Sequence, residues 1–279
     1  MNVLSLFDGI ACGRVALQRA GIPVTSYHAS EVKLYAIKCA KQNHPDIVHV
    51  GSITKWKEWI DTIPVPDLIL GGSPCQGFSV AGTQQAFDDK SSSLFFTFAD
   101  IVKYVRSKNP NVKFMMENVQ MHSVYVGVIS YILDVQPVVI NSALVSAQER
   151  KRFYWCNWHV TQPEDKHIML QDVLEKERRW QALKPWMLHK SSNRGLPRHV
   201  DLRSIDADKA YCLTGSKTHP QNHYLSCDRK QTTYLSVREA ERLQTLPEGY
   251  CDMLSELEAF DVIGNAWTVD VVAHILSCM

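Results

Sequence analysis

Short apolar runs alternate with helix-like stretches over the first 156 residues of the chain. The runs have the length and composition of strands, and we predict strands over Val3–Phe7, Val24–Ser30, Ile47–Val50, Leu68–Leu70, Val112–Glu117 and Val138–Val145. Intervening stretches such as 32–43 and 94–107 have the pattern of helices. This alternation predicts an α/β fold with a doubly wound, mostly parallel sheet, whose ligands bind at the carboxyl ends of the strands.

The pattern breaks down after Trp158. Residues 159–232 are rich in His, Lys, Arg, Ser and Pro and predict a small irregular lobe. Helical periodicity returns over Val237–Leu246 and Asn265–Leu276. We therefore predict a main domain over residues 1–157, a lobe over residues 158–232, and a segment over residues 233–279 that completes the main domain.

The chain has 279 residues, of which 45% are hydrophobic, and this is enough to bury a substantial core. Its net charge is only +1, but residues 151–230 carry fifteen Lys and Arg against nine Asp and Glu. A basic segment beside an acidic remainder is typical of proteins that bind a polyanion, although an ordinary solvated surface gives the same pattern.

The eight cysteines never form a Cys-x-x-Cys pair, which argues against a zinc site, and a disulfide framework is improbable in a chain of this length. The N-terminus lacks a basic start followed by an apolar run, and no apolar stretch reaches 18 residues. We expect reduced thiols, no metal, no membrane span and a cytoplasmic location.

The first predicted strand leads into a turn of small residues, from Phe7 to Gly13. Such a turn lets backbone N–H groups approach a ligand closely. Its Gly9-x-x-x-Gly13 spacing differs from the glycine pattern of nicotinamide-binding proteins and counts against an oxidoreductase. Glu31 ends the second strand, where a carboxylate can accept both hydroxyls of a ribose. Alone, these features are common in α/β proteins.

A possible nucleophile follows the strand that ends at Leu70. Cys75 lies in a loop rich in Gly and Pro, which favours an exposed, fixed thiol over a core cysteine. A second strand ends in the polar pair Glu117 and Asn118. In the segment 148–152, alternation places Gln148, Arg150 and Arg152 on one face of an extended chain, for which a charged edge strand is the simpler interpretation.

Together these motifs resemble the C5-cytosine methyltransferase family. The shared elements, in order, are Phe-Asp-Gly-x-x-x-Gly at 7–13, Glu31, Pro-Cys-Gln at 74–76, Glu-Asn-Val at 117–119, Gln-x-Arg-x-Arg at 148–152 and Gly-Asn-Ala-Trp at 264–267. Segments 6–11 and 170–174 are similar to animal de novo enzymes, whereas 78–79 with 94–96 are similar to bacterial modification enzymes. The resemblance covers nearly the whole chain outside the lobe and implies an S-adenosylmethionine-dependent methyltransferase fold.

The resemblance implies a covalent mechanism on a flipped-out cytosine. The Cys75 thiolate would attack C6, and Glu117 would hydrogen-bond N3 and the exocyclic amine. Arg152 would hold the cytosine O2, Arg150 would brace the catalytic loop, and Asn118 would fix the backbone at the nucleophile.

The same resemblance implies S-adenosylmethionine as cofactor, with Phe7 beside the adenine, Glu31 at the ribose and 265–267 at the methionine end. The implied cofactor-binding residues are Phe7, Asp8, Gly9, Ile10, Ala11, Cys12, Glu31, Val32, Ser52, Ile53, Asn265, Ala266 and Trp267. Two departures stand out. Ser52 replaces the Asp that in the family contacts the adenine amine, so we expect weaker cofactor binding. Ser91–Ser93 replace an Arg-Gly-Thr that is frequent in the family.

Duplex DNA is the expected partner, bound by a monomer in a bacterial or phage-infected cell. The candidate DNA contacts are Gln76, Ser79, Arg178, Arg194 and Arg198. A small basic lobe supplies many phosphate contacts but few contacts to base edges, so we expect a recognition site of about two to four base pairs, with CpG or GpC as first guesses.

Three alternatives remain at this point. A tRNA cytosine methyltransferase shares the catalytic motifs, but its relatives carry a Cys-Phe-Thr signature in the lobe that is absent here. A catalytically inactive DNA-binding homologue is disfavoured by the intact Cys75, Glu117 and Arg152. A nicotinamide oxidoreductase would need the missing glycine pattern.

Overall fold

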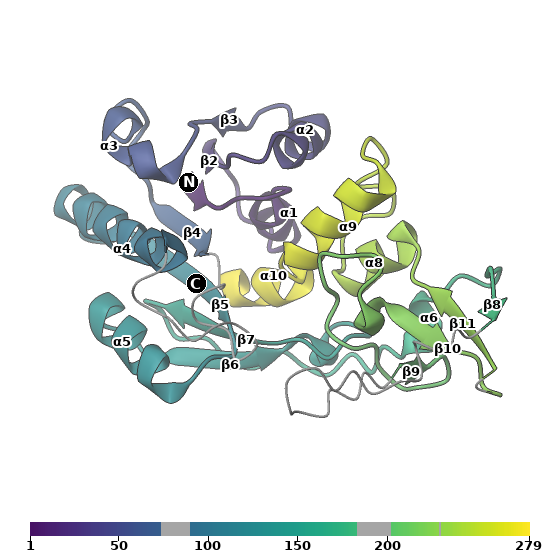
Figure 1. Cartoon of the computed structure of the whole chain (residues 1–279). Helices are drawn as coiled ribbons and strands as arrows, with labels where there is room; N and C mark the ends of the chain where they lie inside the picture. Colours follow the sequence, from purple (N-terminus) through teal and green to yellow (C-terminus); the bar gives the residue numbers. More distant parts are fainter. Residues whose placement is uncertain (74–89, 183–201, 229) are drawn as a thin grey trace. The chain divides into compact units, whose positions relative to one another are not determined.

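The computed structural model describes residues 1–73, 90–182, 202–228 and 230–279 (Figure 1). The chain forms two compact units. The sheet unit contains Met1–Asn141, Lys151–Pro163 and Val269–Met279, and the lobe unit contains Ser142–Arg150 and Glu164–Thr268. Residues 142–150 and 233–268 thus belong to the lobe unit. The predicted division into a main domain over 1–157, a lobe over 158–232 and a completing segment over 233–279 stays a prediction.

A seven-stranded sheet forms the centre of the sheet unit. Its strands are β1 (Asn2–Leu6), β2 (Ser26–Ser30), β3 (Val48–His49), β4 (Leu68–Gly72), β5 (Lys113–Val119), β6 (Pro137–Asn141) and β7 (Lys151–Cys156). The order is β3-β2-β1-β4-β5-β7-β6; the first five strands are parallel, and β7 is antiparallel to both of its neighbours. The predicted doubly wound, mostly parallel sheet is confirmed.

Helices cover both faces of this sheet. They are α1 (Cys12–Arg19), α2 (Leu34–Asn43), a 3-10 turn η1 (Ile53–Lys55), α3 (Trp56–Trp59), α4 (Lys90–Lys108), α5 (Ser123–Leu133) and α10 (Val269–Ser277). Figure 1 shows α1 and α10, which pack on each other, on one side of the sheet and α4 and α5 on the other. Phe95 and Phe98 of α4 are fully buried in the cluster that includes Leu4 and Leu6 of β1. Burying each of these side chains stabilises the fold by about 2 kcal/mol.

One predicted strand was too long, and the edge-strand alternative for segment 148–152 is wrong. Strand β7 begins only at Lys151 and lies in the interior of the sheet. The strand predicted over 138–145 ends at Asn141, and η2 (Ser142–Leu144) follows it. An arginine is tolerated in β7 because a carboxylate of the neighbouring strand pairs with it, as described below.

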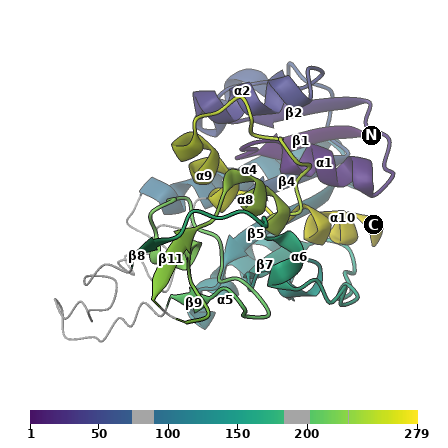
Figure 2. The ribbon, with the colours of Figure 1, turned by 90° about the vertical axis from the view of Figure 1, so that its right-hand side faces the viewer.

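The lobe unit contains a small four-stranded sheet where an irregular lobe was predicted. Its strands are β8 (Gln181–Ala182), β9 (Arg203–Ser204), β10 (His223–Leu225) and β11 (Gln231–Tyr234), in the order β8-β11-β10-β9. All four are labelled in Figure 1, and β8, β11 and β9 also in Figure 2. Strands of two to four residues are too short to show a period of two in the sequence. Within its described residues, the helical segments of this unit are η2, α6 (Leu170–Val173), η3 (Pro220–Asn222), α8 (Val237–Leu243) and α9 (Glu256–Asn265).

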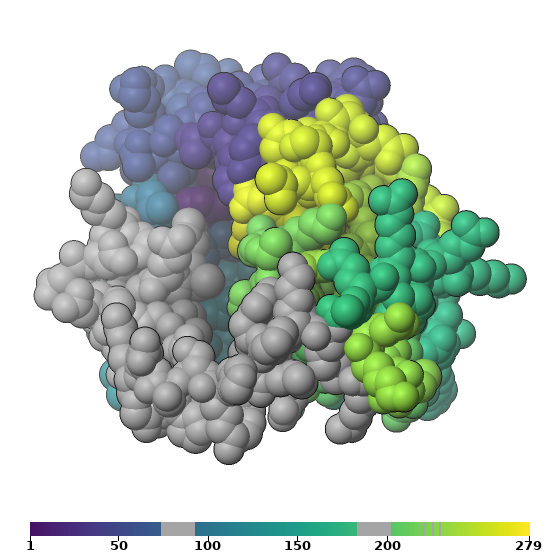
Figure 3. Space-filling view, turned by 45° about the vertical axis from the view of Figure 1, so that its right-hand side comes forward, coloured from purple at the N-terminus to yellow at the C-terminus, as the bar shows by residue number. Residues whose placement is uncertain are grey.

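Helices α8 and α9 begin with capping boxes, in which Ser236 pairs with Glu239 and Ser255 with Glu258. Leu257, the second residue of α9, is exposed. Figure 3 shows the C-terminal part of the chain, in yellow, at the surface. The helix predicted over 265–276 started too early, since Asn265 is the last residue of α9 and α10 begins only at Val269. Ala266 between them is extended, with φ −72° and ψ 163°.

One stretch of the described chain, Glu256–Ser277, is long and apolar enough by composition to cross a membrane, with a mean hydropathy of 1.2. It is interrupted by the break after Asn265, and 72% of its most apolar window is buried within the protein. Burial of this kind is also found in the core helices of water-soluble proteins.

Candidate functional site

Four strands of the sheet unit end at the same edge. Leu6 pairs with Ser30 on one side and with Gly71 on the other, and Gly72 pairs with Glu117. The residues that follow β1, β2 and β4, together with the end of β5, therefore lie along one edge, where ligands of doubly wound folds bind.

The turn after β1 has an unusual backbone. Phe7, Gly9 and Ala11 have positive φ angles of 58°, 60° and 63°. For the two residues with a Cβ atom this conformation costs about 1 kcal/mol each, a strain typical of functional turns. Ala11 and the neighbouring Cys12 are buried, as is Ile10, so a ligand at this turn would contact them through backbone atoms.

Glu31 holds this turn in place. One carboxylate oxygen accepts the Gly9 N–H at 2.9 Å, and the other accepts the N–H groups of Val32 at 2.7 Å and Lys33 at 2.9 Å. A carboxylate has about four lone-pair positions, so one remains for a ligand hydroxyl. The Val32 side chain beside it is 67% exposed and offers an apolar surface.

Asp8 lies buried behind the same turn. The Tyr27 hydroxyl donates to its Oδ1 at 2.7 Å. Burial raises the pKa of Asp8 to about 6, assisted by the nearby Glu31 charge and opposed by the hydroxyls of Ser5 and Tyr27. The Ser5 hydroxyl lies close enough to act on this pKa without making a well-formed hydrogen bond. The carboxyl is thus a support of the turn and is itself largely shielded from a ligand.

Ser52 follows β3 and is tied to the end of β2, because the Ser30 hydroxyl donates to the Gly51 carbonyl at 2.8 Å. The Ser52 hydroxyl caps the η1 turn by accepting the Thr54 N–H at 3.3 Å, and it shares a 2.8 Å hydrogen bond with the Thr54 hydroxyl. This capping occupies much of the capacity that we expected to serve the adenine amine. The next residue, Ile53, has its side chain in the core.

Two of the predicted catalytic side chains form an ion pair. Arg152 Nε lies 3.1 Å from Glu117 Oε1, and both side chains are largely buried. Their strands are neighbours, with Val119 of β5 paired with Arg152 of β7. The pair places a carboxylate and a guanidinium side by side, which together can hydrogen-bond both donors and acceptors of one planar base.

Asn118 points back toward the strand that leads to the predicted nucleophile. Its Nδ2 donates to the Ser73 hydroxyl at 3.2 Å, and its Oδ1 accepts the Val119 N–H at 2.8 Å. Both Asn118 and Ser73 are buried. Cys75 itself lies outside the described residues, as do the predicted DNA contacts Gln76, Ser79, Arg194 and Arg198.

Arg150 belongs to the lobe unit, and its guanidinium is buried. Nη1 donates to the carbonyls of Leu213 and Gly264, both at 3.2 Å, and Nη2 donates to the Ala266 carbonyl at 2.9 Å. Among the described residues it therefore braces the 264–266 segment; its expected role in bracing the catalytic loop concerns residues that the structure does not describe.

The structure corrects the expectation for Arg178. Only 8% of its side chain is exposed, and its guanidinium forms an ion pair with the fully buried Glu239. Glu239 also accepts the Glu175 N–H at 2.7 Å and the Ser236 N–H at 2.9 Å. The sequence showed only the positive charge of Arg178, whereas the fold commits that charge to an internal partner.

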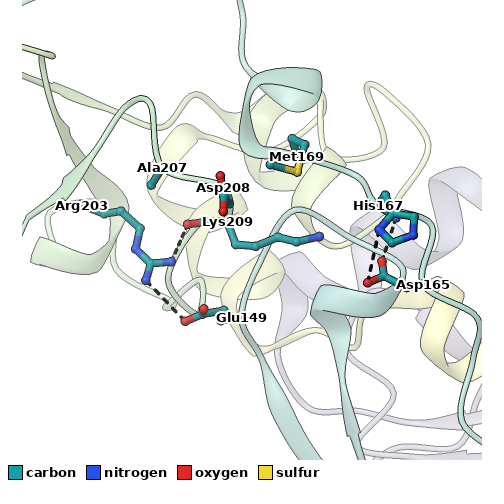
Figure 4. A pocket seen from close by; sticks show the side chains of 8 residues that line it. All are labelled: Glu149, Asp165, His167, Met169, Arg203, Ala207, Asp208 and Lys209. Atoms are coloured by element: carbon teal, nitrogen blue, oxygen red, sulfur yellow. Dashed lines mark hydrogen bonds and ion pairs between the residues drawn. The ribbon is translucent and has the colours of Figure 1, made fainter.

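The lobe unit also has an open cavity of about 380 Å³, shown in Figure 4. Two of its basic residues already have partners: Arg203 pairs with Glu149, and Lys209 donates to the carbonyls of Ala143, Ser146 and Ile168. None of the residues predicted for catalysis or cofactor binding lines it. We assign it no chemistry.

Sequence analysis missed a short lobe motif beside Arg150. Residues 212–214 read Cys-Leu-Thr and differ from the Cys-Phe-Thr signature only at the central position. Arg150 Nη1 lies 3.4 Å from Cys212 Sγ. A search that allowed another large apolar residue at the centre would have found this segment. The absence of an exact Cys-Phe-Thr signature therefore does not exclude a tRNA substrate.

Comparison with known proteins identifies a family. The sequence model of the C-5 cytosine-specific DNA methylase family matches residues 1–124 and 159–279. The Type II methyltransferase M1.ScrFI of Lactococcus lactis subsp. cremoris is 28% identical over all of this chain and 77% of its own length, and M.NlaX of Neisseria lactamica is 25% identical over all of this chain and 96% of its own. The orphan methyltransferase M.Rho11sI of Bacillus phage rho11s is 40% identical over 43% of this chain and 23% of its own length.

Solved structures share the fold. The Dnmt2 methyltransferase of S. pombe superposes with a TM-score of 0.72 at 20% identity, covering 99% of this chain and 97% of its own. The Entamoeba histolytica methyltransferase EhMeth gives a TM-score of 0.76 at 17% identity, covering 99% and 96%. The predicted methyltransferase fold is thereby confirmed.

Proposed function

Because its sequence matches the family model over most of its length, the chain belongs to the C-5 cytosine-specific DNA methylase family, and we propose how its residues act. The family and its relatives identify the enzyme as a DNA cytosine-5-methyltransferase. The finer proposal is that it methylates a flipped-out cytosine in duplex DNA, at a short site, through a covalent bond to Cys75. The observation that carries it is the Glu117–Arg152 pair at the end of β5, beside the strand that leads to Cys75.

The turn after β1, together with Glu31, fits S-adenosylmethionine. Glu31 has acceptor capacity left for a ribose hydroxyl, the exposed Val32 offers an apolar contact, and the close Gly9 turn lets backbone N–H groups approach. Phe7 would lie beside the adenine and residues 265–267 at the methionine end. When bound, this cofactor supplies an electrophilic methyl group on sulfur.

In the proposed reaction, the Cys75 thiolate forms a bond to cytosine C6, and the electrons of the C5–C6 double bond make C5 nucleophilic. N3 takes up a proton as the ring is attacked, and Glu117 accepts from this N3–H and from the exocyclic amine. Arg152 donates to O2, so the negative charge that the attack would leave on the ring is neutralised at N3 and stabilised at O2. C5 would then form a bond to the methyl carbon as the methyl–sulfur bond of the bound cofactor broke. A base removes the C5 proton, and the Cys75–C6 bond breaks as the double bond re-forms.

A trapping experiment tests the covalent step. DNA containing 5-fluorocytosine has no removable C5 proton, so the wild-type enzyme with S-adenosylmethionine should form an adduct that survives denaturation. Cys75→Ser should abolish it, whereas Cys39→Ser, at a buried thiol on α2, should retain it. An adduct that persists in Cys75→Ser would reject the assignment.

The substrate is a separate question, because a tRNA enzyme shares the motifs and the 212–214 segment is close to Cys-Phe-Thr. We propose duplex DNA and a cytoplasmic bacterial or phage-infected host, in line with the bacterial and phage relatives. Expression in a host without cytosine methylation, followed by bisulfite sequencing of genomic DNA and of tRNA, decides between the two. Methylation in DNA at sites of two to four base pairs is expected; methylation confined to tRNA would reject the DNA proposal.

A further inference from the structure

The break between α9 and α10 is held by buried side chains from distant parts of the lobe unit. It covers Ala266, Trp267 and Thr268, directly after Asn265. Asn265 is exposed, and its Nδ2 donates to the Asp261 carbonyl at 2.8 Å. The end of α9 therefore exposes the Asn265 side chain, whereas Trp267 and Thr268 of the following break are buried.

Gln244 is the centre of this arrangement, and its side chain is fully buried. Its Nε2 donates to the carbonyls of Ile263 at 2.9 Å and Ala266 at 3.1 Å, on either side of Asn265. Its Oε1 accepts the Thr268 hydroxyl at 2.8 Å and Gln148 Nε2 at 2.9 Å. The amide thus uses both donors and both lone pairs.

The orientation of this amide is determined by a chain of hydrogen bonds that starts at a backbone donor. The Leu213 N–H donates to Gln148 Oε1 at 3.2 Å, so Gln148 must turn its Nε2 toward Gln244 Oε1. Gln244 must then direct its own Nε2 at the two carbonyls. The Ser142 hydroxyl, which donates to Thr268 Oγ1 at 2.8 Å, fixes the direction of the Thr268 hydroxyl in the same way.

Arg150 approaches the same segment, since Nη2 donates to the Ala266 carbonyl that Gln244 also holds. A buried network of polar side chains stabilises a fold less than a packed apolar core would. When all its members are hydrogen-bonded, however, it fixes the conformation of the backbone that they hold. Such a network is suited to keeping a binding segment in its ligand-ready geometry.

We propose that Gln244 is a positioning residue that preorganises the 265–267 segment for the cofactor. The inference rests on the proposed function, in which this segment takes the methionine end of S-adenosylmethionine. Gln244 does not touch the cofactor; it acts through the Ile263 and Ala266 carbonyls. Its loss should therefore weaken cofactor binding while affinity for DNA is kept.

The test is Gln244→Glu, which preserves shape but places an oxygen where Nε2 faces two carbonyls. Titration calorimetry should show a dissociation constant for S-adenosylmethionine raised at least about tenfold, because two buried hydrogen bonds are replaced by repulsion. The KM for DNA should change less than about twofold. Gln171→Glu is the control: the exposed Gln171 donates its Nε2 to the Ile205 carbonyl in the same unit, so the same amide-to-carboxylate change is made where the partner carbonyl lies outside residues 263–268.

A pH series separates positioning from general damage. At low pH the carboxyl introduced by Gln244→Glu becomes protonated and can donate again, so the cofactor affinity of this variant should recover relative to wild type. Gln171→Glu should show no such recovery. If Gln244→Glu does not fold, Thr268→Val carries the test, since it removes one bond to Gln244 Oε1 and should weaken cofactor binding by several-fold.

The possible outcomes separate this inference from the proposed function. If wild type binds S-adenosylmethionine and Gln244→Glu or Thr268→Val binds it equally well, or loses DNA affinity to the same extent, Gln244 has no positioning role. If wild type itself does not bind S-adenosylmethionine, the proposed function fails and this inference fails with it.

Discussion

Arg152 Nε lies 3.1 Å from Glu117 Oε1 across the antiparallel pairing of β7 with β5. The two side chains that we assign to opposite edges of one cytosine are thus partners before any base arrives. A base that enters would exchange this internal contact for contacts to N3, the exocyclic amine and O2. The exchange limits the cost of leaving either charge unpaired in a largely buried place.

Glu117 and Glu31 should give opposite kinetic phenotypes. Glu117→Gln should lower kcat about a hundredfold, because the lost contact develops in the transition state, and should leave S-adenosylmethionine affinity nearly unchanged. Glu31→Gln should weaken cofactor binding first, since an amide cannot accept at both ends from the Gly9, Val32 and Lys33 N–H groups. Calorimetry with steady-state kinetics would show an exchange of phenotypes if the sites were misassigned.

Substitution of Arg150 should mainly lower the stability of the protein, whereas substitution of Arg152 should mainly lower kcat. Arg150→Lys loses the fork that reaches Leu213, Gly264 and Ala266, and should lower the free energy of unfolding by about 2–3 kcal/mol. Arg152→Lys should lower kcat with a much smaller effect on stability. Denaturant unfolding and kinetics of both variants check this, and an equal loss of stability would contradict it.

Asp8 should make stability depend on pH between about 4 and 6. Its pKa is raised to about 6 in the fold from 3.8, so the folded state binds the extra proton and is destabilised as pH rises through this window. The full effect is roughly 3 kcal/mol. The free energy of unfolding of Asp8→Asn, measured relative to wild type by denaturant unfolding, should therefore be higher at pH 8 than at pH 4. Asp46→Asn, at a carboxylate that is 58% exposed, is the control; an equal pH dependence in both variants would refute the assignment.

Arg178 should matter for folding and not for DNA. Arg178→Met leaves Glu239 buried without its cation and should destabilise the protein by about 3–5 kcal/mol, and adding Glu239→Gln should recover part of the loss. Arg179→Met at the exposed neighbour is the control. The salt dependence of DNA binding by Arg178→Met should match that of wild type. If the slope of log K against log salt concentration fell by about one, Arg178 would contact a phosphate after all.

Ser52→Asp should tighten cofactor binding. Aspartate caps a helical turn as well as serine does, so the Thr54 N–H keeps its acceptor while a second oxygen becomes available to the adenine amine. A gain of several-fold in S-adenosylmethionine affinity by calorimetry is expected, with Ser52→Ala as the variant that removes both functions. Unchanged affinity in Ser52→Asp would place the adenine elsewhere.

The sequence by itself determined the features that are local. Alternating apolar runs predicted the doubly wound sheet, because helices cover both faces of a parallel sheet and its strands are therefore apolar on both faces. Motif order predicted the family, and the Gly9 turn and Glu31 were found because each follows a strand directly. The sequence predicted a tight turn after the first strand, but not that Phe7, Gly9 and Ala11 would all have positive φ angles there.

Only the tertiary structure decided which distant groups meet. The interior place of β7 brings Arg152 to Glu117. Gln244 donates to the carbonyls of Ile263 and Ala266 at the break between α9 and α10, where the helix predicted over 265–276 was expected to begin. Arg178 reads as a surface cation until Glu239 is seen beside it. Periodicity reports how one segment divides between water and the core, whereas an ion pair or a buried amide depends on the partner that a separate part of the chain brings to it.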